Sequence, residues 1–569
     1  MQRRPILRLA ALAAATVVLA AVPAVANASA PAAVPPSAPT ARAEVAAMQP
    51  GWNLGNTFDS IGADETAWGN PRVTRALLKQ VRAQGFRSIR IPVTWGDHQG
   101  AAPGYTIDPA WLSRVREVVG WALDEDLYVM INMHHDSWMW VNQLGTDHDT
   151  VLARYTATWT QIAAAFRDAP RRLVFESINE PQFSGTSGDA QNYQLMDEIN
   201  TVFHRVVRAS GGANATRLLV LPTLFANADQ GRLDDLVATF TALGDPNVAA
   251  TVHFYGFWPF SVNIAGFTRF DATTQQDLTG TFDRVFNAFV AKGIPAIIGE
   301  YGLLGFDVST NAIEQGEKLK FFEFLGYYAR TRGLTTMLWD NGQHFNRTTF
   351  QWNDPELYQQ IRSSWTVRSG TAATDLLFVR KSAPVTDATV ALNLNGNRLT
   401  SIVDGNRMLV RGRDYTVSAD QQSVTFSAAL LARLVGTQGY GVDAVLSARF
   451  SCGVPWHFRV RSYDTAVPRD ATGTTDGLTI PTAFNGDLLA TMEATYADGS
   501  GNAGPQNWTS YKEFGRAFMP DYTANTITMT PAFFAETKDG TVDLTLHFWS
   551  GATLRYTLVK SGTQVTGTA

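Results

Sequence analysis

The stretch Val174-Phe-Glu-Ser-Ile-Asn-Glu-Pro181 decides how the rest of the chain is interpreted. A short apolar run that ends in Asn179-Glu180-Pro181 predicts a buried parallel strand, because proline stops the strand and its last side chains emerge at the carboxyl end. A second apolar run, Ile297-Ile-Gly-Glu-Tyr-Gly302, also delivers a glutamate, Glu300, at its end. A carboxyl group at such a poorly solvated strand end is expected to have a raised pKa. The two glutamates are therefore candidates for paired acid–base chemistry.

Short apolar runs alternate with amphipathic segments from Trp52 to Asn341. Eight strands alternating with helices, at a repeat of roughly forty residues, predict an α/β protein with a (β/α)₈ TIM barrel. An open doubly wound sheet is the alternative, but this region contains neither a G-x-G-x-x-G sequence nor a phosphate-loop lysine motif. The predicted strands are Trp52–Phe58, Phe86–Val93, Leu127–His134, Arg172–Glu180, Arg217–Pro222, Val248–Tyr255, Ile294–Glu300 and Leu334–Trp339.

Polar or aromatic side chains fall at the carboxyl end of nearly every predicted strand, which is where the chemistry of such barrels takes place. Core packing does not require this set, and its charged members should not lie at barrel-interior ends unless they are paired or functional. The set comprises Asn56, Arg90, His134, His135, Asn179, Glu180, His253, Tyr255, Glu300 and Trp339.

Paired carboxyl groups suit glycoside hydrolysis, because the transition state is a cationic, oxocarbenium-like sugar. One carboxyl group must be protonated to release the leaving oxygen, and the other must be ionised to attack or stabilise C1. We assign Glu180 as the acid/base and Glu300 as the nucleophile. Arg90 is predicted to keep Glu300 ionised by an opposite-charge contact, with a structural salt bridge to another barrel residue as its alternative role.

His134 and His135 raise the possibility of a metal site. Adjacent residues on a strand point to opposite faces, so the pair is not expected to bind one ion, and no H-x-x-x-H spacing supports zinc. We therefore predict no metal and no cofactor, and place His134 in the sugar site as a hydroxyl partner. Hydrolysis by a Ser-His-Asp triad is disfavoured because no G-x-S-x-G sequence is present.

The N-terminal segment is typical of a secretory signal, with Arg3 and Arg4 before an apolar core and a small-residue cleavage site before Ser29. We predict a signal peptide over 1–28, an Ala/Pro-rich disordered linker over 29–43, and a secreted, extracellular protein without a membrane anchor. The balance of 46 basic to 51 acidic residues gives no electrostatic reason to expect nucleic acid. The single cysteine excludes an intrachain disulfide.

Helical periodicity disappears after Trp365, and Thr, Val, Gly, Asp and Asn become frequent, which is typical of antiparallel β modules. A weak internal repeat relates the segment from Asp414 to the segment from Asp521. We predict two small all-β sandwich modules after a catalytic domain over 44–368, at 371–465 and 466–569. Exposed aromatic residues of the last module are candidate sugar platforms, with packing at a module interface as the alternative; they are Trp508, Tyr511 and Trp549.

Seven motifs together resemble glycoside hydrolase family 5, most closely its subfamily 4. They are Gly51-Trp-Asn-Leu-Gly-Asn-Thr57, Ile89-Arg-Ile-Pro-Val-Thr-Trp95, Asn132-Met-His-His135, Ile178-Asn-Glu-Pro181, His253-Phe-Tyr255, Gly299-Glu300 and Leu338-Trp339. The resemblance implies a retaining mechanism without metal or organic cofactor, with the same acid/base and nucleophile and carboxyl groups about 5–5.5 Å apart. It further implies that Asn179 holds the sugar 2-hydroxyl, Tyr255 contacts the nucleophile and Trp339 forms the sugar floor.

The tail also shows resemblances. Residues 371–465, with Leu394-Asn-Gly396 and Arg413-Asp-Tyr-Thr-Val417, resemble an X2-type immunoglobulin-like module. Residues from about 466, with Pro505-Gln-Asn-Trp-Thr509 and His547-Phe-Trp-Ser-Gly551, resemble carbohydrate-binding module family 46. This order is similar to that of enzymes whose last module folds back and helps to grip a branched glucan.

These observations predict a secreted, retaining endo-β-1,4-glucanase that acts on cellulose-type or xyloglucan chains. Mixed-linkage glucan, xylan and mannan remain alternative substrates on the same scaffold. A non-catalytic glycan-binding protein on a decayed barrel is the alternative from another class, and loss of either glutamate would favour it, but both are present. The expected partner is the polysaccharide, with no nucleic acid, membrane or obligate protein partner.

Overall fold

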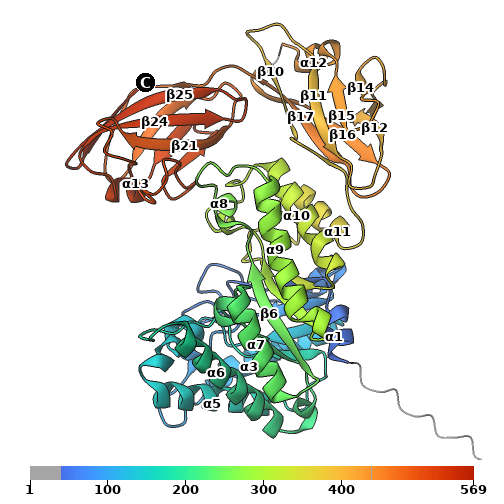
Figure 1. Cartoon of the computed structure of the whole chain (residues 1–569), viewed down its shortest axis with the longest axis vertical. Helices are drawn as coiled ribbons and strands as arrows, with labels where there is room; N and C mark the ends of the chain where they lie inside the picture. The colour runs from blue at the N-terminus through green and yellow to red at the C-terminus, as the bar shows by residue number, and fades with distance from the viewer. Residues whose placement is uncertain (1–39, 438) are drawn as a thin grey trace, which may run out of the picture. The chain divides into compact units, whose positions relative to one another are not determined.

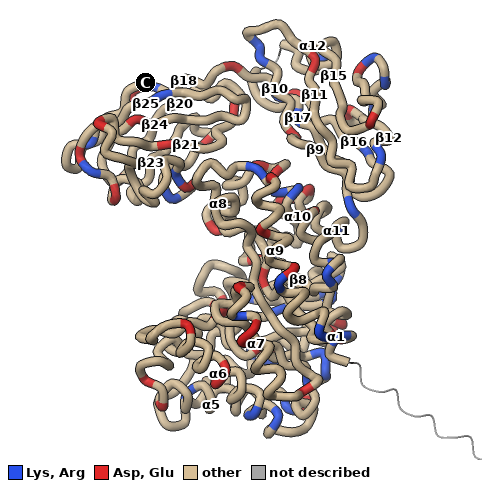
Figure 2. Tube along the Cα trace, in the orientation of Figure 1, with Lys and Arg blue, Asp and Glu red and all other residues tan. Residues whose placement is uncertain are grey.

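The computed structural model describes residues 40–569 with the exception of residue 438 (Figure 1). The predicted signal peptide and the predicted linker up to residue 39 lie outside the described residues. Charges of both signs are interspersed along the trace (Figure 2), in keeping with the net charge of −5. Among the described helices, none is both long and apolar enough to cross a membrane.

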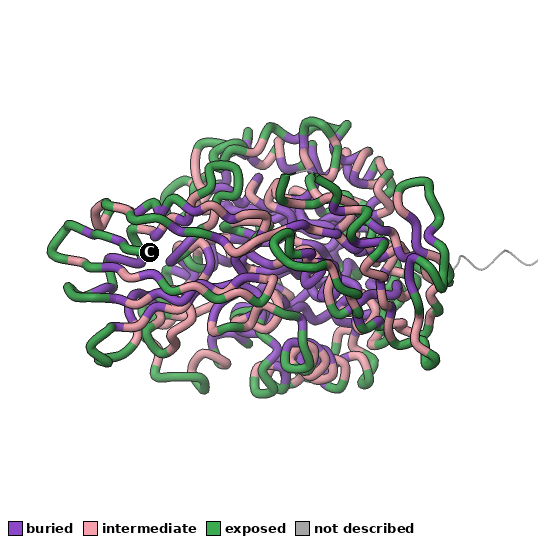
Figure 3. The backbone as a smooth tube through the Cα atoms, turned by 90° about the horizontal axis from the view of Figure 1, so that it is seen from above, coloured by how far each residue is buried: buried purple, intermediate pink, exposed green. Residues whose placement is uncertain are grey.

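The first half of the described chain forms a closed barrel of parallel strands in the order β1 to β8, as the alternating apolar runs predict. Buried residues concentrate in the middle of the view in Figure 3, and exposed residues lie at its rim. The strands are β1 (Gly51–Asn53), β2 (Ser88–Ile91), β3 (Tyr128–Ile131), β4 (Leu173–Glu176), β5 (Leu219–Pro222), β6 (Val248–Phe254), β7 (Ala296–Tyr301) and β8 (Thr335–Leu338).

Helices follow the strands and supply the outer layer, and short 3₁₀ turns lie in several of the connections. The α-helices after β1 are α2 (Arg75–Ala83), α3 (Pro109–Asp124), α4 (Asp136–Met139), α5 (His148–Ala165), α6 (Asp189–Ala209), α7 (Gln230–Leu243), α8 (Trp258–Ser261), α9 (Ala272–Ala288), α10 (Gln315–Thr331) and α11 (Pro355–Ser364). The 3₁₀ turns are η1 (Gly96–His98), η2 (Val141–Gly145), η3 (Gly212–Ala215), η4 (Leu224–Ala226), η5 (Val290–Lys292) and η6 (Leu304–Asp307).

Helix α1 (Ala41–Ala47) corrects the predicted linker, whose last residues, 41–43, are helical. The Thr40 side chain caps this helix by accepting from the backbone N–H of Ala43. Val45 and Met48 are buried in one apolar cluster with strand residues of the barrel interior. The carbonyl groups of Val45 and Met48 accept hydrogen bonds from the first residues of β8 and β2. Helix α1 therefore closes the amino end of the barrel, opposite the strand ends that carry the site residues.

Most strands end earlier than the sequence predicts, whereas β5 ends at the predicted Pro222 and β7 ends one residue later than predicted, at Tyr301. Strands β1, β3 and β4 end at Asn53, Ile131 and Glu176, so Asn56 and Glu180 lie in the connections that follow. Both of these residues have positive φ, 51° and 38°, which lies outside the extended backbone region that defines a β-strand. The side-chain amide of Asn53 donates to the carbonyl groups of Gly299, Met337 and Leu338 and so ties the connection after β1 to its neighbours.

Two β-sandwiches follow the barrel, as predicted. The first pairs the sheets β10-β17-β16-β12-β13 and β14-β15-β11-β9, and the second pairs β19-β26-β25-β24-β21 and β18-β20-β23-β22. Their elements are β9 (Thr371–Ala372), β10 (Leu376–Arg380), β11 (Ala388–Asn393), β12 (Leu399–Asp404), β13 (Arg407–Met408), β14 (Tyr415–Val417), β15 (Ser423–Phe426), α12 (Ala428–Val435), β16 (Gly441–Phe450), β17 (Trp456–Tyr463), β18 (Val467–Pro468), β19 (Ala471–Thr474), β20 (Leu478–Ala483), β21 (Leu489–Tyr496), β22 (Phe518–Asp521), β23 (Thr526–Met529), α13 (Pro531–Ala535), β24 (Gly540–Phe548), β25 (Thr553–Ser561) and β26 (Gln564–Thr568).

The internal repeat appears in the fold as the same succession of elements. Strands β14 and β15, helix α12 and strand β16 in the first sandwich correspond to β22, β23, α13 and β24 in the second. The last module also contacts the barrel, because the side chain of Asn263 donates to the carbonyl of Ala490 and the Asn263 carbonyl accepts from the N–H of Phe514.

Asp340 organises the connection that follows β8 and Trp339. Its buried carboxylate accepts from the indole N–H of Trp52 at 3.0 Å and from the backbone N–H groups of Gly342, His344 and Phe345 at 2.9, 3.1 and 2.9 Å. We predict that Asp340→Ala lowers the free energy of unfolding by about 2–4 kcal/mol, because it leaves these donors without an acceptor. Calorimetric melting of the full chain measures the loss.

The matched control is Asp64→Ala, which removes an exposed carboxylate that accepts from the N–H of Thr66 at the surface. Its melting temperature should stay close to that of the wild type. Equal melting temperatures for both variants would show that Asp340 does not hold this connection together.

Candidate active site

Arg90 is the centre of the polar network at the carboxyl end of the barrel. Its fully buried guanidinium donates to Glu176 at 2.7 Å, to Asn53 at 3.0 Å, to Glu300 at 2.6 Å and to Asn179 at 2.7 Å. Burial alone would lower the pKa of Arg90, but the charges of Glu176 and Glu300 outweigh it and raise the pKa. The predicted contact of Arg90 with Glu300 is therefore present. The alternative, a structural salt bridge to another barrel residue, is present as well, with Glu176.

Glu300, the penultimate residue of β7, is held by a second donor on its other oxygen. The hydroxyl of Tyr255 donates to Oε2 of Glu300 at 2.6 Å, while Oε1 accepts from Arg90. Burial and the neighbouring charges of Glu300 and Glu180 raise the pKa of Tyr255 well above 10, so its hydroxyl keeps its proton. Both oxygens of Glu300 are thus fixed by donors from β2 and from the end of β6.

Glu180 lies beyond the end of β4, and its side chain is 45% exposed, against 6% for Glu300. Its Oε1 is 2.8 Å from Nδ1 of His253, and the same nitrogen lies 3.6 Å from Oε2 of Glu300. One carboxylate oxygen of each glutamate and a ring nitrogen of His253 all lie within 4.8 Å of one another. His253 therefore stands between the two carboxyl groups.

The raised pKa that the sequence predicts for Glu180 is wrong for this structure. Burial would raise the pKa of Glu180, but the hydrogen bond and charge of His253, helped by Arg90, outweigh it and lower the pKa. Burial would likewise lower the pKa of His253, but Glu300 and Glu180 outweigh it and raise the pKa. The shared proton of this pair therefore rests on His253, a partner that spacing along the chain did not suggest.

His134 and His135 lie together, so the prediction that they point to opposite faces is wrong. Their ring centroids are 4.5 Å apart, because β3 ends at Ile131 and strand alternation no longer applies. The ring of His134 lies parallel to that of Trp339, with centroids 6.0 Å apart. Burial, followed by the charges of His135 and Arg90, holds the pKa of His134 well below 6.5, so its ring is neutral.

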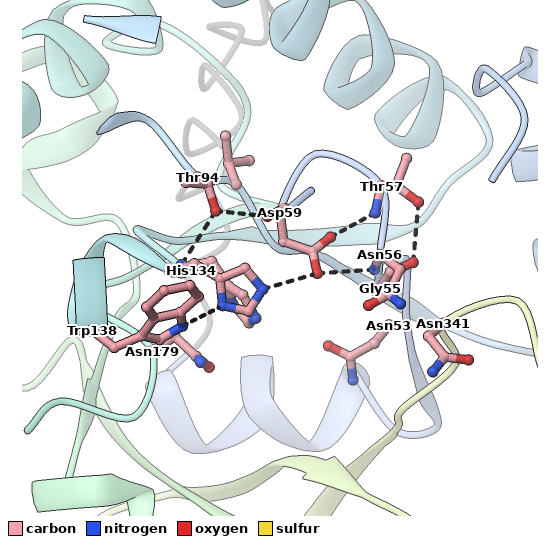
Figure 4. Close-up of polar contacts among 12 residues, drawn as sticks. Asn53, Gly55, Asn56, Thr57, Asp59, Thr94, His134, Trp138, Asn179 and Asn341 are labelled. Carbon is pink, nitrogen blue, oxygen red and sulfur yellow. Dashed lines mark hydrogen bonds and ion pairs between the residues drawn. The ribbon is translucent and has the colours of Figure 1, made fainter. Parts of the chain in front are cut away.

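Asp59 is a site residue that the sequence analysis missed. Figure 4 shows its carboxylate accepting from the backbone N–H groups of Asn56 and Thr57, at 2.9 and 2.7 Å. On its other side, Nε2 of His135 lies 3.7 Å away, and the indole of Trp138 donates to Nδ1 of the same ring at 3.0 Å. The position of Asp59, three residues after Asn56 and two after Thr57, is the one signal in the sequence that could have indicated it.

Two groups of residues in this region have the donor atoms that a metal ion would need, each within 4.8 Å. One is Glu180, His253 and Glu300, and the other is Asp59, His134 and His135. Most of these atoms already serve hydrogen bonds, as described above, and Nδ1 of His134 faces the side-chain amide of Asn132 at 3.1 Å. The absence of a metal and of a cofactor stays a prediction.

The aromatic residues predicted as platforms in the last module have different surroundings. Trp508 is 60% exposed, and its ring centroid lies 6.2 Å from that of Trp258 in α8 of the barrel. The guanidinium of Arg269 lies 4.8 Å over the ring of Trp549, and Tyr511 packs against Gly266. Trp549 and Tyr511 are half-buried beside barrel residues, whereas Trp508 is mostly exposed, as expected of a platform.

Comparison with known proteins agrees with this geometry. The family model for cellulase (glycosyl hydrolase family 5) matches residues 51–345. Endoglucanase B of Paenibacillus lautus is 56% identical over 528 residues, which cover 92% of this chain and 93% of the relative. The chain belongs to glycosyl hydrolase family 5. It is a family 5 endo-β-1,4-glucanase with carbohydrate-binding modules.

The tail of this family 5 enzyme matches the carbohydrate binding domain X2 at residues 371–460 and the family 46 carbohydrate binding domain at 464–568. The solved structure of the full-length tri-modular endo-β-1,4-glucanase B from Bacillus halodurans is 51% identical, with a TM-score of 0.92 and coverage of 94% of this chain and 99% of that one. A tri-modular subfamily 4 endoglucanase from Bacillus licheniformis, solved with cellotetraose, is 31% identical, with a TM-score of 0.79 and coverage of 91% and 99%.

We predict that Glu180→Gln lowers the pKa of His253. The variant removes one of the two carboxylates that raise this pKa above its ordinary value of 6.5. The imidazolium of the wild type should therefore persist above pH 6.5, and the variant should lose that proton at lower pH. NMR titration of isotope-labelled histidines in the full chain measures both curves.

The matched control for this titration is Glu198→Gln, which removes the carboxylate that pairs with His148 on the surface. It should shift the titration of His148 alone. A His253 titration that is the same in Glu180→Gln and in the wild type would contradict the ion pair.

Proposed function

We propose that this endoglucanase cleaves β-1,4-glucan chains with retention of configuration, by double displacement, with Glu300 as nucleophile and Glu180 as acid/base. The observation that carries the proposal is the approach of the two carboxyl groups, whose facing oxygens lie within 4.8 Å. Retaining glycosidases separate their carboxyl groups by about 5–5.5 Å, whereas inverting enzymes need about 6.5–9.5 Å to admit a water molecule.

In the first step, an oxygen of Glu300 bonds to C1 and the bond from C1 to the leaving oxygen breaks. Arg90 and Tyr255 each donate to one oxygen of Glu300 and fix its orientation, so that its attack on C1 needs little reorganisation. The leaving oxygen takes its proton from Glu180, which is replenished through the hydrogen bond to His253.

In the second step, Glu180 acts as the base. It accepts a proton from a water molecule, whose oxygen bonds to C1 as the ester bond to Glu300 breaks. The low pKa of Glu180 in the presence of protonated His253 suits this role, because an ionised carboxylate is needed at that point. One His–Glu pair thus serves both steps.

The cleaved sugar is proposed to lie over Trp339. Oδ1 of Asn179 accepts from Arg90, which leaves the amide N–H groups of Asn179 as donors for the sugar 2-hydroxyl. The remaining sugar contacts are proposed for His134, His135, Asn56 and His253.

Cellulose-type chains and xyloglucan are the proposed substrates of a secreted enzyme, with mixed-linkage glucan, xylan and mannan as alternatives. The cellotetraose bound to the Bacillus licheniformis relative supports an unbranched β-1,4-glucan. The exposed face of Trp508 next to Trp258 supports contacts to a longer or branched chain. No protein partner is proposed.

We predict that azide rescues Glu180→Ala and Glu300→Gly with opposite stereochemistry on an aryl cellobioside with a good leaving group. The acid/base variant still forms the ester on Glu300, so azide should give the β-cellobiosyl azide. The nucleophile variant lacks the ester, so azide should take the place of Glu300 and give the α product. Without azide, turnover of unactivated oligosaccharides should fall by about 10²–10⁴ in Glu180→Ala. Product anomers are read by NMR.

Glu198→Ala is the control for these variants, because it removes a surface carboxylate and should keep wild-type turnover without azide. The same anomer from both active-site variants would contradict the assignment of the two roles.

We predict that Trp508→Ala lowers kcat/KM on polymeric xyloglucan by about three- to tenfold and leaves cellotetraose hydrolysis unchanged. A short substrate fills the barrel site alone, whereas a branched polymer extends to the last module. Initial rates on the two substrates measure the difference, and Trp508→Phe, which keeps a ring, should lose less. Equal losses on both substrates would contradict a role for Trp508 in binding polymer.

A further inference from the structure

The 3₁₀ turn η4, which follows β5, contains an unusual pair of residues. Phe225 has φ 58° and ψ 14°, and the next residue, Ala226, also has a positive φ of 50°. Non-glycine side chains rarely adopt this left-handed conformation, and two in succession make this turn a strained segment of the barrel. Strain of this kind persists only where the surroundings hold it in place, and it is concentrated at functional sites.

The strained turn is fixed to the segment that carries the acid/base. The backbone N–H of Phe225 donates to the carbonyl of Pro181, the residue after Glu180, at 2.8 Å. The N–H of Ala226 donates to the carbonyl of Thr223 at 2.9 Å, and the buried hydroxyl of Thr223 donates to the carbonyl of Asn227 at 2.7 Å. The position of Phe225 is therefore coupled to that of Glu180.

The ring of Phe225 does not serve core packing. Leu224 and Ala226 are buried, but the phenyl ring between them is 43% exposed. The guanidinium of Arg232 lies 4.9 Å from the centroid of this ring, and Arg232 is itself near Asp229, at 3.7 Å. The Arg232 guanidinium thus covers one face of the Phe225 ring by a cation–π contact and fixes the ring. Much of the ring's apolar surface stays open to solvent.

The order of the strands indicates which sugar unit of a substrate the Phe225 ring would contact. Most residues proposed to hold the cleaved sugar, such as His134 and Trp339, follow β3 and β8, and His253 of β6 lies between the two glutamates, whereas β5 lies on the other side of β4 from β3. Because Glu180 gives its proton to the leaving oxygen, the departing sugar must lie on its side of the site. The backbone of Phe225 lies on that side, hydrogen-bonded to Pro181, the residue after Glu180.

We propose that Phe225, supported by Arg232, is a stacking platform for a glucosyl unit on the leaving-group side of the cleaved bond. This inference rests on the proposed role of Glu180 and adds a binding residue to it. Aromatic rings present a flat apolar surface to the C–H faces of a β-linked glucose, and a ring held by its backbone loses little entropy on binding. The same platform would hold an acceptor sugar in the second step.

The test compares Phe225→Ala with the wild type on two substrates. An aryl cellobioside places no sugar on the leaving-group side, so its kcat/KM should stay within about twofold, whereas kcat/KM for cellopentaose should fall about tenfold. With the aryl cellobioside as donor and cellobiose as acceptor, the ester bond from C1 to Glu300 breaks, a bond from C1 to the acceptor oxygen forms, and the acceptor's hydroxyl proton goes to Glu180. The ratio of this transfer product to the hydrolysis product should fall in Phe225→Ala.

Two controls separate binding from folding. Phe225→Tyr keeps the ring, so its kcat/KM on each substrate and its ratio of transfer to hydrolysis product should match those of the wild type. Tyr440→Ala removes an aromatic ring of similar exposure, 49%, that also has a lysine, Lys381, over its face but belongs to the first sandwich. It should leave all rates unchanged. Phe225→Gly, which accepts a positive φ, should melt no lower than Phe225→Ala and show the same loss on cellopentaose.

The inference is overturned if Phe225→Ala loses activity equally on both substrates, or keeps the wild-type transfer ratio. Failure of the proposed function is distinguishable, because the wild type itself would then form no β-linked transfer product. A wild type that transfers with retention, together with a Phe225→Ala variant that transfers equally well, would refute the platform alone.

Discussion

A single buried guanidinium holds this site together. Arg90 has no contact with solvent, and a buried charge is strongly unfavourable unless it is paired and fully hydrogen-bonded. The pairing comes from three other strands or the connections after them, through Asn53, Glu176 together with Asn179, and Glu300. The same contacts that make Arg90 tolerable in the barrel interior therefore fix Glu300, the proposed nucleophile, and the side-chain amide of Asn179. One hydrogen-bond network therefore both stabilises the buried charge of Arg90 and positions the side chains around it.

Burial of the two glutamates differs, and this difference separates their roles. Glu300 is held by two donors at the base of the site, whereas Glu180 lies beyond its strand, half exposed, and bonds to a histidine. A carboxyl group fixed by two donors suits attack at C1, and a carboxylate that shares its proton with a neighbour suits transfer in both directions. The proton of the pair rests on His253 because Glu300 and Glu180 together outweigh the cost of burying its charge. The environment, rather than the residue type, distinguishes two chemically identical side chains.

Aromatic surfaces extend the site away from this network. Trp339 lies beside the neutral His134, Phe225 rests on Arg232 next to the acid/base, and Trp508 of the last module lies near Trp258. Flat rings of this kind bind a sugar chain along its length without fixing its charge or protonation. The hydrogen bonds of Asn263 link the last module, which carries Trp508, to the barrel, and the proposed function has one polysaccharide chain contact rings of both.

The sequence by itself determined the barrel, the two sandwiches and the residues at the strand ends, because apolar periodicity and punctuation by proline act locally. It also indicated both glutamates and the Arg90–Glu300 contact. Only the tertiary structure decided where the strands end, and with that the side-by-side rings of His134 and His135, the helical start at Ala41 and the covered face of Trp549. It also decided the lowered pKa of Glu180 and the contacts of Asp59 and Phe225. Each of these depends on partners from distant segments, and the field at a carboxyl group is a sum over neighbours that no local pattern contains.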